Sequence, residues 1–258
     1  MKVSLVTTLG TSPPVVTEFL RYVAEAEKLP VTALVVIATK DEIVLKGLEL
    51  VRAAVRYRYP STHIRIVTLP FQDVTSQDET LEFMARFAEV LQEQRSVHRA
   101  SIILLSLAGG RKDMGITAAL VAQYFGVNGV YHIVMPNIKI VNEKLEAARH
   151  HIDELNEADD SLAYYGQHAD IFEPIMYPPL SEYSVIKIPL IPYPTSLLKE
   201  VARLLEPGKK ELRRFRISQD VVRGLQSSGL VRVTSAGTVY PLEEGLKLYE
   251  MLRRFTLA

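Results

Sequence analysis

The sequence of 258 residues predicts an α/β fold in which a mostly parallel sheet is covered by helices on both faces. Five short, continuously apolar runs have the composition of doubly buried strands, and amphipathic helical patterns separate them. After residue 194 the pattern changes to helix, helix, small hairpin and helix, the order of a winged-helix module. We therefore expect a Rossmann-like, doubly wound sheet followed by a small winged-helix-like domain.

The apolar runs and helical patterns give the order of elements. The expected strands are KVSLVTT (2–8), VTALVVIA (31–38), HIRIVTL (63–69), SIILLSL (101–107) and GVYHIVM (129–135). Apolar residues at helical spacing mark the first two helices: Val16, Phe19, Leu20, Val23, Val44, Leu48, Val51 and Val55. Ser76 and Glu79 form a capping box for the third helix. The fourth, from about Lys112 to Phe125, is apolar nearly all round, so it is either deeply buried or covered by a partner subunit.

The expected domains are 1–194 and 195–258. Within the first, residues 1–135 form the core, and 136–194 are a less regular elaboration that ends in a strand at 183–191. The division follows a change in charge as well as in pattern. The second domain holds 12 Lys and Arg against 7 Asp and Glu, although the whole chain has a net charge of +0.

Composition excludes several classes of function. No apolar stretch approaches the ~18 residues that span a bilayer. The opening MKVSLVTTLG runs directly into a strand pattern, so we expect no signal peptide and a cytoplasmic protein without a membrane partner. Because the chain has no cysteine, disulfides, thiolate nucleophiles and cysteine zinc sites are excluded. We expect no metal and no other cofactor.

Ligands of doubly wound sheets bind at the carboxyl ends of the strands, where the strand order switches. Three loops are expected there: TLGTSPP (8–14), ATKDE (38–42) and SLAGGRK (106–112). None matches a common catalytic pattern. SLAGGRK is not the GxxxxGK[ST] loop of nucleotide hydrolases, and the chain contains neither GxGxxG nor GxSxG. The adjacent His150 and His151 would face different ways on a helix, so we expect surface histidines and not a metal site.

The SLAGGRK loop is suited to an anionic ligand. Gly109 and Gly110 allow positive φ and a close approach of the main chain. The first amides of the following helix favour anions, and Arg111 and Lys112 add full positive charges. The alternative is an ordinary strand–helix turn with two solvated cations.

The other two loops contain residues suited to capping helices. Ser12 is expected to be an N-cap with Pro13 at the first helical position. Asp41 is expected to cap the second helix, with Glu42 as an acid in its first turn. A capping hydroxyl can still face a ligand, so the two roles are compatible.

Together, TLGTSP after the first strand and SLAGGRKDM after the fourth resemble the CARF (CRISPR-associated Rossmann fold) proteins, which sense cyclic oligoadenylates made in type III CRISPR defence. The resemblance covers residues 1–135 well and is looser beyond them. It implies a C2 homodimer whose two crevices meet across the axis, with the apolar fourth helix at the contact. It also implies cyclic tetra-adenylate, or cyclic hexa-adenylate, as the ligand.

Some CARF proteins, the ring nucleases, also cleave the ring without metal, by means of a serine of the first loop and a lysine of the fourth-strand turn. The matching positions are Ser12 and Lys112. The expected products are linear adenylates with 2′,3′-cyclic phosphate ends, which would switch off the antiviral signal. The positions expected to bind the ligand are Gly10, Thr11, Thr39, Asp41, Gly109, Gly110, Arg111 and Met114. Three tyrosines could stack on adenines or belong to the core: Tyr164, Tyr165 and Tyr177.

The alternative is a non-catalytic sensor or transcriptional regulator that acts through the winged-helix tail. Residues 199–216 hold seven cations against three acids, which is consistent with a weak contact to DNA or with a solvated connector. The expected recognition helix, capped by Ser218, has only Arg223 as a cation, which is little for reading bases. The tail contains no histidine, so it lacks the Arg–His pattern of the HEPN ribonucleases.

Overall fold

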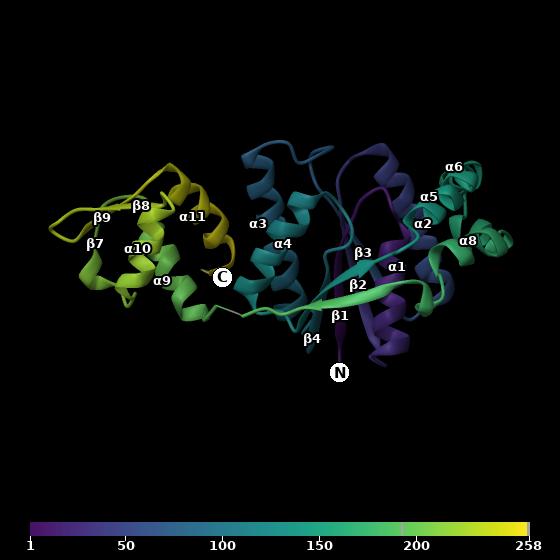
Figure 1. Ribbon diagram of the computed structural model, residues 1–258, viewed down its shortest axis with the longest axis horizontal. Coiled ribbons are helices and arrows are strands. Elements are labelled where there is room, and N and C mark those ends of the chain that lie inside the picture. Colours follow the sequence, from purple (N-terminus) through teal and green to yellow (C-terminus); the bar gives the residue numbers. More distant parts are fainter. Residues whose placement is uncertain (192, 257–258) are drawn as a thin grey trace.

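A six-stranded sheet forms the centre of the first part of the chain (Figure 1). The computed structural model describes residues 1–191 and 193–256. In the order of the sheet, the strands are β3 (His63–Thr68), β2 (Val31–Ala38), β1 (Val3–Leu9), β4 (Ile102–Ser106), β5 (Gly129–Val134) and β6 (Ser184–Ile188). Strands β1 to β5 run parallel, and β6 pairs antiparallel with β5. The predicted α/β class with a mostly parallel, doubly wound sheet is confirmed.

The central strand is buried on both faces, as its apolar run predicts. All seven residues of β1 are buried, and β1 pairs with β2 on one side and with β4 on the other. Neighbouring residues enter different cores: Leu5 belongs to one hydrophobic cluster and Val6 to the other. Burial of each such side chain contributes roughly 1.5–3 kcal/mol to the stability of the fold. The side chains of β1 therefore hold both helical layers against the sheet.

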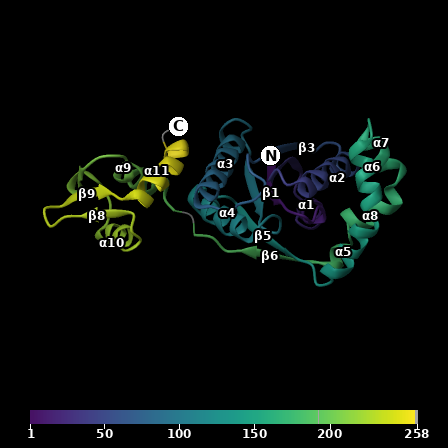
Figure 2. The ribbon, with the colours of Figure 1, turned by 90° about the horizontal axis from the view of Figure 1, so that it is seen from above.

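Helices cover both faces of the sheet (Figure 2). On the Leu5 face lie α1 (Pro14–Arg21), its π-helical continuation η1 (Tyr22–Ala26) and α2 (Glu42–Arg58). On the Val6 face lie α3 (Gln77–Ser96) and α4 (Lys112–Phe125). The predicted capping box is confirmed, because Ser76 Oγ accepts a hydrogen bond from the Glu79 amide at 3.2 Å and donates one to the Glu79 carboxylate at 3.0 Å.

The segment between β5 and β6 is helical, which corrects the expectation of a less regular elaboration. Its helices are α5 (Ile138–Ala147), α6 (Arg149–Glu157), α7 (Ser161–Gln167) and α8 (Ala169–Met176), followed by the short turn η2 (Leu180–Glu182). Helices α6, α7 and α8 contact α2, so this helical arm extends the α2 side of the sheet (Figure 1). Strand β6 then returns the chain along the edge formed by β5.

The last part of the chain forms a small module on the other side of the molecule (Figure 2). Its elements are α9 (Thr195–Leu205), β7 (Lys210–Glu211), η3 (Leu212–Arg214), α10 (Gln219–Ser227), β8 (Val231–Val233), β9 (Thr238–Pro241) and α11 (Glu243–Thr256). The predicted cap is confirmed, since Ser218 Oγ accepts from the Val221 amide at 3.4 Å. The order of elements matches the expectation, while the winged-helix assignment and the domain boundary after residue 194 stay predictions.

Helix α11 joins this module to the sheet domain. It contacts α3, and Met251 and Leu252 are buried in the same hydrophobic cluster as the core of α3. Across the described residues, no helix has the length and apolar character needed to cross a membrane.

Candidate functional site

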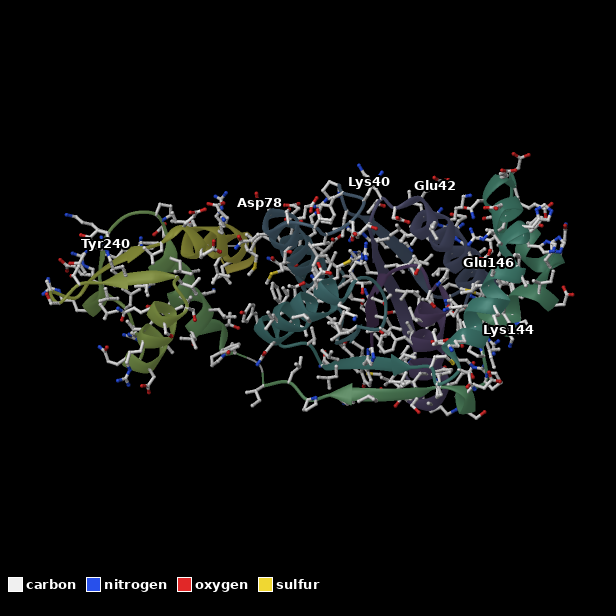
Figure 3. All side chains as sticks on the ribbon, turned by 45° about the horizontal axis from the view of Figure 1, so that its top comes forward. Lys40, Glu42, Asp78, Lys144, Glu146 and Tyr240 are labelled. Carbon is white, nitrogen blue, oxygen red and sulfur yellow. The ribbon has the colours of Figure 1, made fainter. Side chains whose placement is uncertain are left out.

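The two glycine-bearing loops meet at the carboxyl ends of β1 and β4. Strand β1 leads through α1 to β2 on one side, whereas β4 lies on the other side of β1, so the strand order switches between them. A Cβ atom added to Gly10 would lie 2.9 Å from the amide nitrogen of Gly110, which shows how closely the loops approach. The loop after β2 and the start of α3 lie along the same edge, where Lys40, Glu42 and Asp78 are seen in Figure 3. The prediction that the loops after β1, β2 and β4 lie at one edge of the sheet, here called the mouth, is confirmed.

Gly109 is required by the packing of the two strands. A Cβ atom there would lie 1.9 Å from the carbonyl oxygen of Thr8, a distance no side chain allows. Thr8 Oγ1 donates a hydrogen bond to the Gly109 carbonyl at 2.5 Å, which fixes the loop against β1. Gly110 has a φ of +81°, in the region that favours glycine, and it is exposed. Gly109 therefore holds the loop in place, and Gly110 presents its backbone at the surface.

Ser12 does not cap α1, which corrects the expectation. The N-cap of α1 is Pro13, the helix begins at Pro14, and no side chain in the described part of the chain caps it. The Ser12 hydroxyl is buried and finds no hydrogen-bond partner among the described residues. Because an unsatisfied buried hydroxyl costs about 1–3 kcal/mol, this group is suited to accepting or donating a hydrogen bond to a bound molecule.

Lys112 is the first residue of α4, directly after its N-cap Arg111. Its side chain is exposed, and no ion pair or hydrogen bond to it is found within the described ranges. No side chain there caps α4 either, so the first amides of the helix are open to a ligand. A cation at a helix N-terminus is unfavourable by itself, and a bound anion would compensate both Lys112 and the helix dipole.

Arg111 is not a free cation. Its guanidinium group forms a bidentate pair with Asp73, with Arg111 Nε at 2.7 Å from Oδ1 and a second contact from Nη2 to Oδ2. The guanidinium beside it lowers the pKa of the Asp73 carboxyl. Asp73, in the loop after β3, is not among the residues that the sequence predicts for the site. Because β3 runs parallel to β2, the loop after β3 is also expected at this edge of the sheet, and this could have indicated Asp73.

Three further residues expected to bind the ligand have structural roles or are buried: Asp41, Thr39 and Met114. Asp41 caps α2, since its Oδ1 accepts hydrogen bonds from the Ile43 and Val44 amides at 2.9 and 3.1 Å, so the structural alternative is confirmed for this residue. Thr39 is 5% exposed and Met114 only 1% exposed. Met114 packs beneath Gly110 and belongs to the core of the α4 face. The structure favours a packing role for Met114.

Thr11 is exposed and lines a groove of about 510 Å³ beside the mouth. The groove runs between the start of α2 and the helices α5 and α6, and Glu42 and Glu146 flank it in Figure 3. Ile43 of α2 and Asn142 of α5 are among its lining residues. The helical arm therefore forms one side of a recess that is continuous with the first loop.

The tyrosines of the arm are mostly structural. Tyr165 and Tyr177 are 0% and 4% exposed, which confirms the core alternative for them. Tyr164 is partly buried, and its ring lies 4.4 Å from that of His168. His151 is also partly buried, against the expectation of a surface histidine, and its Nδ1 lies 3.0 Å from the Tyr164 hydroxyl. None of the described residues forms a group of three His, Asp or Glu side chains that could hold a metal ion.

The cations of the C-terminal module are largely engaged in local pairs. Arg203 pairs with Glu200 at 2.7 Å, and Arg213 and Arg214 share Glu211 at 3.0 and 3.2 Å. Arg223, the only cation of α10, pairs with Asp220. Lys210 bonds carbonyl groups after α9, and burial lowers its pKa. These pairs reduce the charge available to phosphates, and contact with DNA stays a prediction.

Comparison with known proteins places the chain in a family. The family described as CRISPR-associated protein NE0113 matches residues 12–219. The chain is 30% identical over 137 residues to the CRISPR system ring nuclease SSO2081 of Saccharolobus solfataricus, a match that covers 51% of this chain and 71% of the relative.

Two solved structures have weaker similarity. Enterococcus italicus Csm6 bound to cyclic hexa-2′-fluoro-hexa-dAMP has a TM-score of 0.46 and 14% identity, over 80% of this chain and 47% of the other, so the match spans about half of Csm6. Protein VC1899 from Vibrio cholerae has a TM-score of 0.37 and 8% identity, over 98% of this chain and 66% of the other. On the family match and the identity to SSO2081, the chain belongs to the NE0113 family of CRISPR-associated proteins, and its predicted relationship to the ring nucleases is confirmed.

Proposed function

We propose that the chain binds a cyclic oligoadenylate at the mouth between β1 and β4 and cleaves it without metal to linear adenylates, which ends a type III CRISPR signal. One observation carries the proposal: the buried Ser12 hydroxyl finds no hydrogen-bond partner among the described residues, and it lies in a loop that touches the cationic loop before α4. The 30% identity to a ring nuclease supports it.

The residues of the mouth are suited to a reaction in which the substrate supplies its own nucleophile. The ribose 2′-hydroxyl gives up its proton to solvent as its oxygen attacks the adjacent phosphorus, the bond from phosphorus to the 5′-oxygen breaks, and the leaving 5′-oxygen takes up a proton from solvent. Holding these atoms in line is worth up to about 7–11 kcal/mol in ideal cases. Ser12 would orient the reacting group by a hydrogen bond, and Lys112 would stabilise negative charge that develops on the phosphate. No general base is assigned, so we expect slow turnover.

We also propose that the active form is a C2 homodimer. A symmetric ring fits a site to which two identical mouths contribute. On α4, which begins at this mouth, Ile116 and Leu120 are 66% and 41% exposed, although the opposite side of the helix is buried. This apolar face supports α4 as the contact between subunits.

The first test is incubation of the full chain with cyclic tetra-adenylate in EDTA, followed by chromatography of the products. The parent is expected to yield linear adenylates with 2′,3′-cyclic phosphate ends. Ser12→Ala and Lys112→Ala are expected to lose at least tenfold in rate. Ser12→Ala should not destabilise the fold and should raise the free energy of unfolding by up to about 1–3 kcal/mol, because it removes a buried hydroxyl that finds no partner among the described residues.

Lys209→Ala is the matched control, because this exposed lysine lies in the C-terminal module, and it should cleave like the parent. If the ring binds but is not cleaved, the proposed nuclease activity is wrong and the chain is a non-catalytic sensor. If neither the tetra- nor the hexa-adenylate ring binds, the proposed function is wrong.

A further inference from the structure

The pair between Asp73 and Arg111 joins two loops at the mouth of the sheet. Asp73 follows β3, and Arg111 follows β4 on the other side of β1. Both oxygens of the carboxylate contact the guanidinium group, through Nε and Nη2. A bidentate pair of this kind fixes the plane of the guanidinium group as well as its position.

The carboxylate is the better anchored of the two partners. Its side chain is 30% exposed and Oδ1 accepts a hydrogen bond from the Val74 amide at 2.8 Å, whereas the Arg111 side chain is 65% exposed. The loop of Asp73 is also tied to the loop after β2, since the Phe71 carbonyl accepts from the Lys40 amide at 2.8 Å. Asp73 therefore determines where the arginine lies.

The pair leaves part of the guanidinium group available. Arginine has five N–H donors, and contact through Nε and Nη2 uses the edge that faces Asp73. Both hydrogens of Nη1 remain, and within the described ranges no other hydrogen bond from Arg111 is found. These donors are enough for one phosphate oxygen while the pair stays intact.

We propose that Asp73 is a positioning residue for the ligand: it holds Arg111 so that the free edge of the guanidinium group meets a phosphate of the ring. The inference rests on the proposed function. An arginine held in place before binding loses less side-chain freedom when the ligand arrives, which improves affinity. Asp73 need not touch the ring.

The direction in which one substitution changes the ligand affinity distinguishes a positioning role of Asp73 from a purely electrostatic one. Asp73→Asn removes a negative charge near an anionic ligand, so Coulomb attraction alone predicts tighter binding. Loss of the bidentate pair predicts weaker binding, because Arg111 would then have to be ordered by the ligand. We expect Asp73→Asn to weaken binding of cyclic tetra-adenylate on the order of two- to tenfold.

The measurement is calorimetric titration of the full chain in a Ser12→Ala background, in which we expect cleavage to be at least tenfold slower, with chromatography after each titration to check that the ring is intact. Arg111→Ala is expected to weaken binding, and adding Asp73→Asn to it should weaken binding no further and should restore part of it, since only the charge of Asp73 then acts on the ligand. Asp220→Asn is the matched control: it breaks an exposed Asp–Arg pair in the C-terminal module and should bind like its parent.

The outcomes are distinguishable. Binding that is unchanged or tighter in Asp73→Asn overturns the positioning role and leaves the proposed function standing. If Asp73→Asn weakens binding equally in the chain with Arg111 and in the Arg111→Ala variant, the positioning role is also overturned, since Asp73 would then act without the arginine. A parent chain that binds neither the tetra- nor the hexa-adenylate ring overturns both proposals.

Discussion

A buried carboxyl group on α1 makes stability depend on pH. Glu18 is 1% exposed, and its Oε2 has no hydrogen-bond partner among the described residues. Burial raises the pKa of Glu18 from 4.5 to about 7. Because the pKa is higher in the folded than in the unfolded chain, the folded state binds the proton more tightly. The free energy of unfolding therefore falls as the pH rises from about 4.5 to about 7.

We expect Glu18→Gln to remove this dependence. Between pH 5 and pH 8 the parent should lose about 1–3 kcal/mol of stability that the variant keeps, since glutamine does not ionise. Urea denaturation at the two pH values measures the difference. Asp159→Asn, at an exposed position of the arm, should follow the parent. Parallel pH profiles for the parent and Glu18→Gln would contradict the assignment.

Single residues were predictable where their role is local. The caps made by Asp41, Ser76 and Ser218 depend on amides two or three residues ahead, so the sequence contains the whole interaction. The pair of Asp73 and Arg111 was not predictable in this way, because it depends on which strands lie next to each other. The accessibility of individual loop residues likewise follows from packing and not from sequence pattern.

At the scale of elements, the contact between the loop after β4 and the end of β1 permits a sharp test. Gly109→Ala would place Cβ 1.9 Å from the Thr8 carbonyl oxygen, so the two strand ends would have to separate. We expect a loss of about 2–4 kcal/mol in the free energy of unfolding, or failure to fold. Gly115→Ala on α4 is the control.

The control makes the same substitution at a glycine that has room for a Cβ atom. A Cβ atom at Gly115 would meet nothing closer than the Leu107 carbonyl oxygen at 3.5 Å, an ordinary contact, and alanine favours a helix over glycine by about 1 kcal/mol. Gly115→Ala should therefore be neutral or stabilising in thermal denaturation. If both variants were equally stable, the close approach of Gly109 to β1 would be wrong.

Elements were predictable where their hydrophobic pattern is continuous. Strand β2 matches its apolar run at both ends, and the other strands of the first sheet differ by one to three residues. The helical arm was missed because its helices are short, seven to ten residues each; α5 has Ile138, Val141 and Leu145 at helical spacing, but over ten residues this pattern is weak evidence for a helix. Helix α8 also contains Pro174, a residue that normally argues against a helix.

At the scale of the whole molecule, the C-terminal module shares a core with the sheet domain. Met251 and Leu252 on α11 are each 2% exposed, and Lys247 Nζ lies 3.4 Å from Gln77 Oε1 at the start of α3. The charge difference along the sequence indicated a separate module, but it could not indicate this contact. Which helix the module packs against depends on shape complementarity between distant segments.

The proposed dimer is testable on the exposed face of α4. Ile116→Glu places a charge on a side chain that is 66% exposed in the single chain, so thermal stability of the protomer should change little. In a dimer that buries this face, the same charge is desolvated without a partner and should prevent association. Light scattering should show a dimer for the parent and a monomer for the variant, and ring cleavage should fall with dimerisation because each ring needs two mouths. Val97→Glu, at a 68% exposed position after α3, should remain dimeric. A parent that is already monomeric would contradict the proposal.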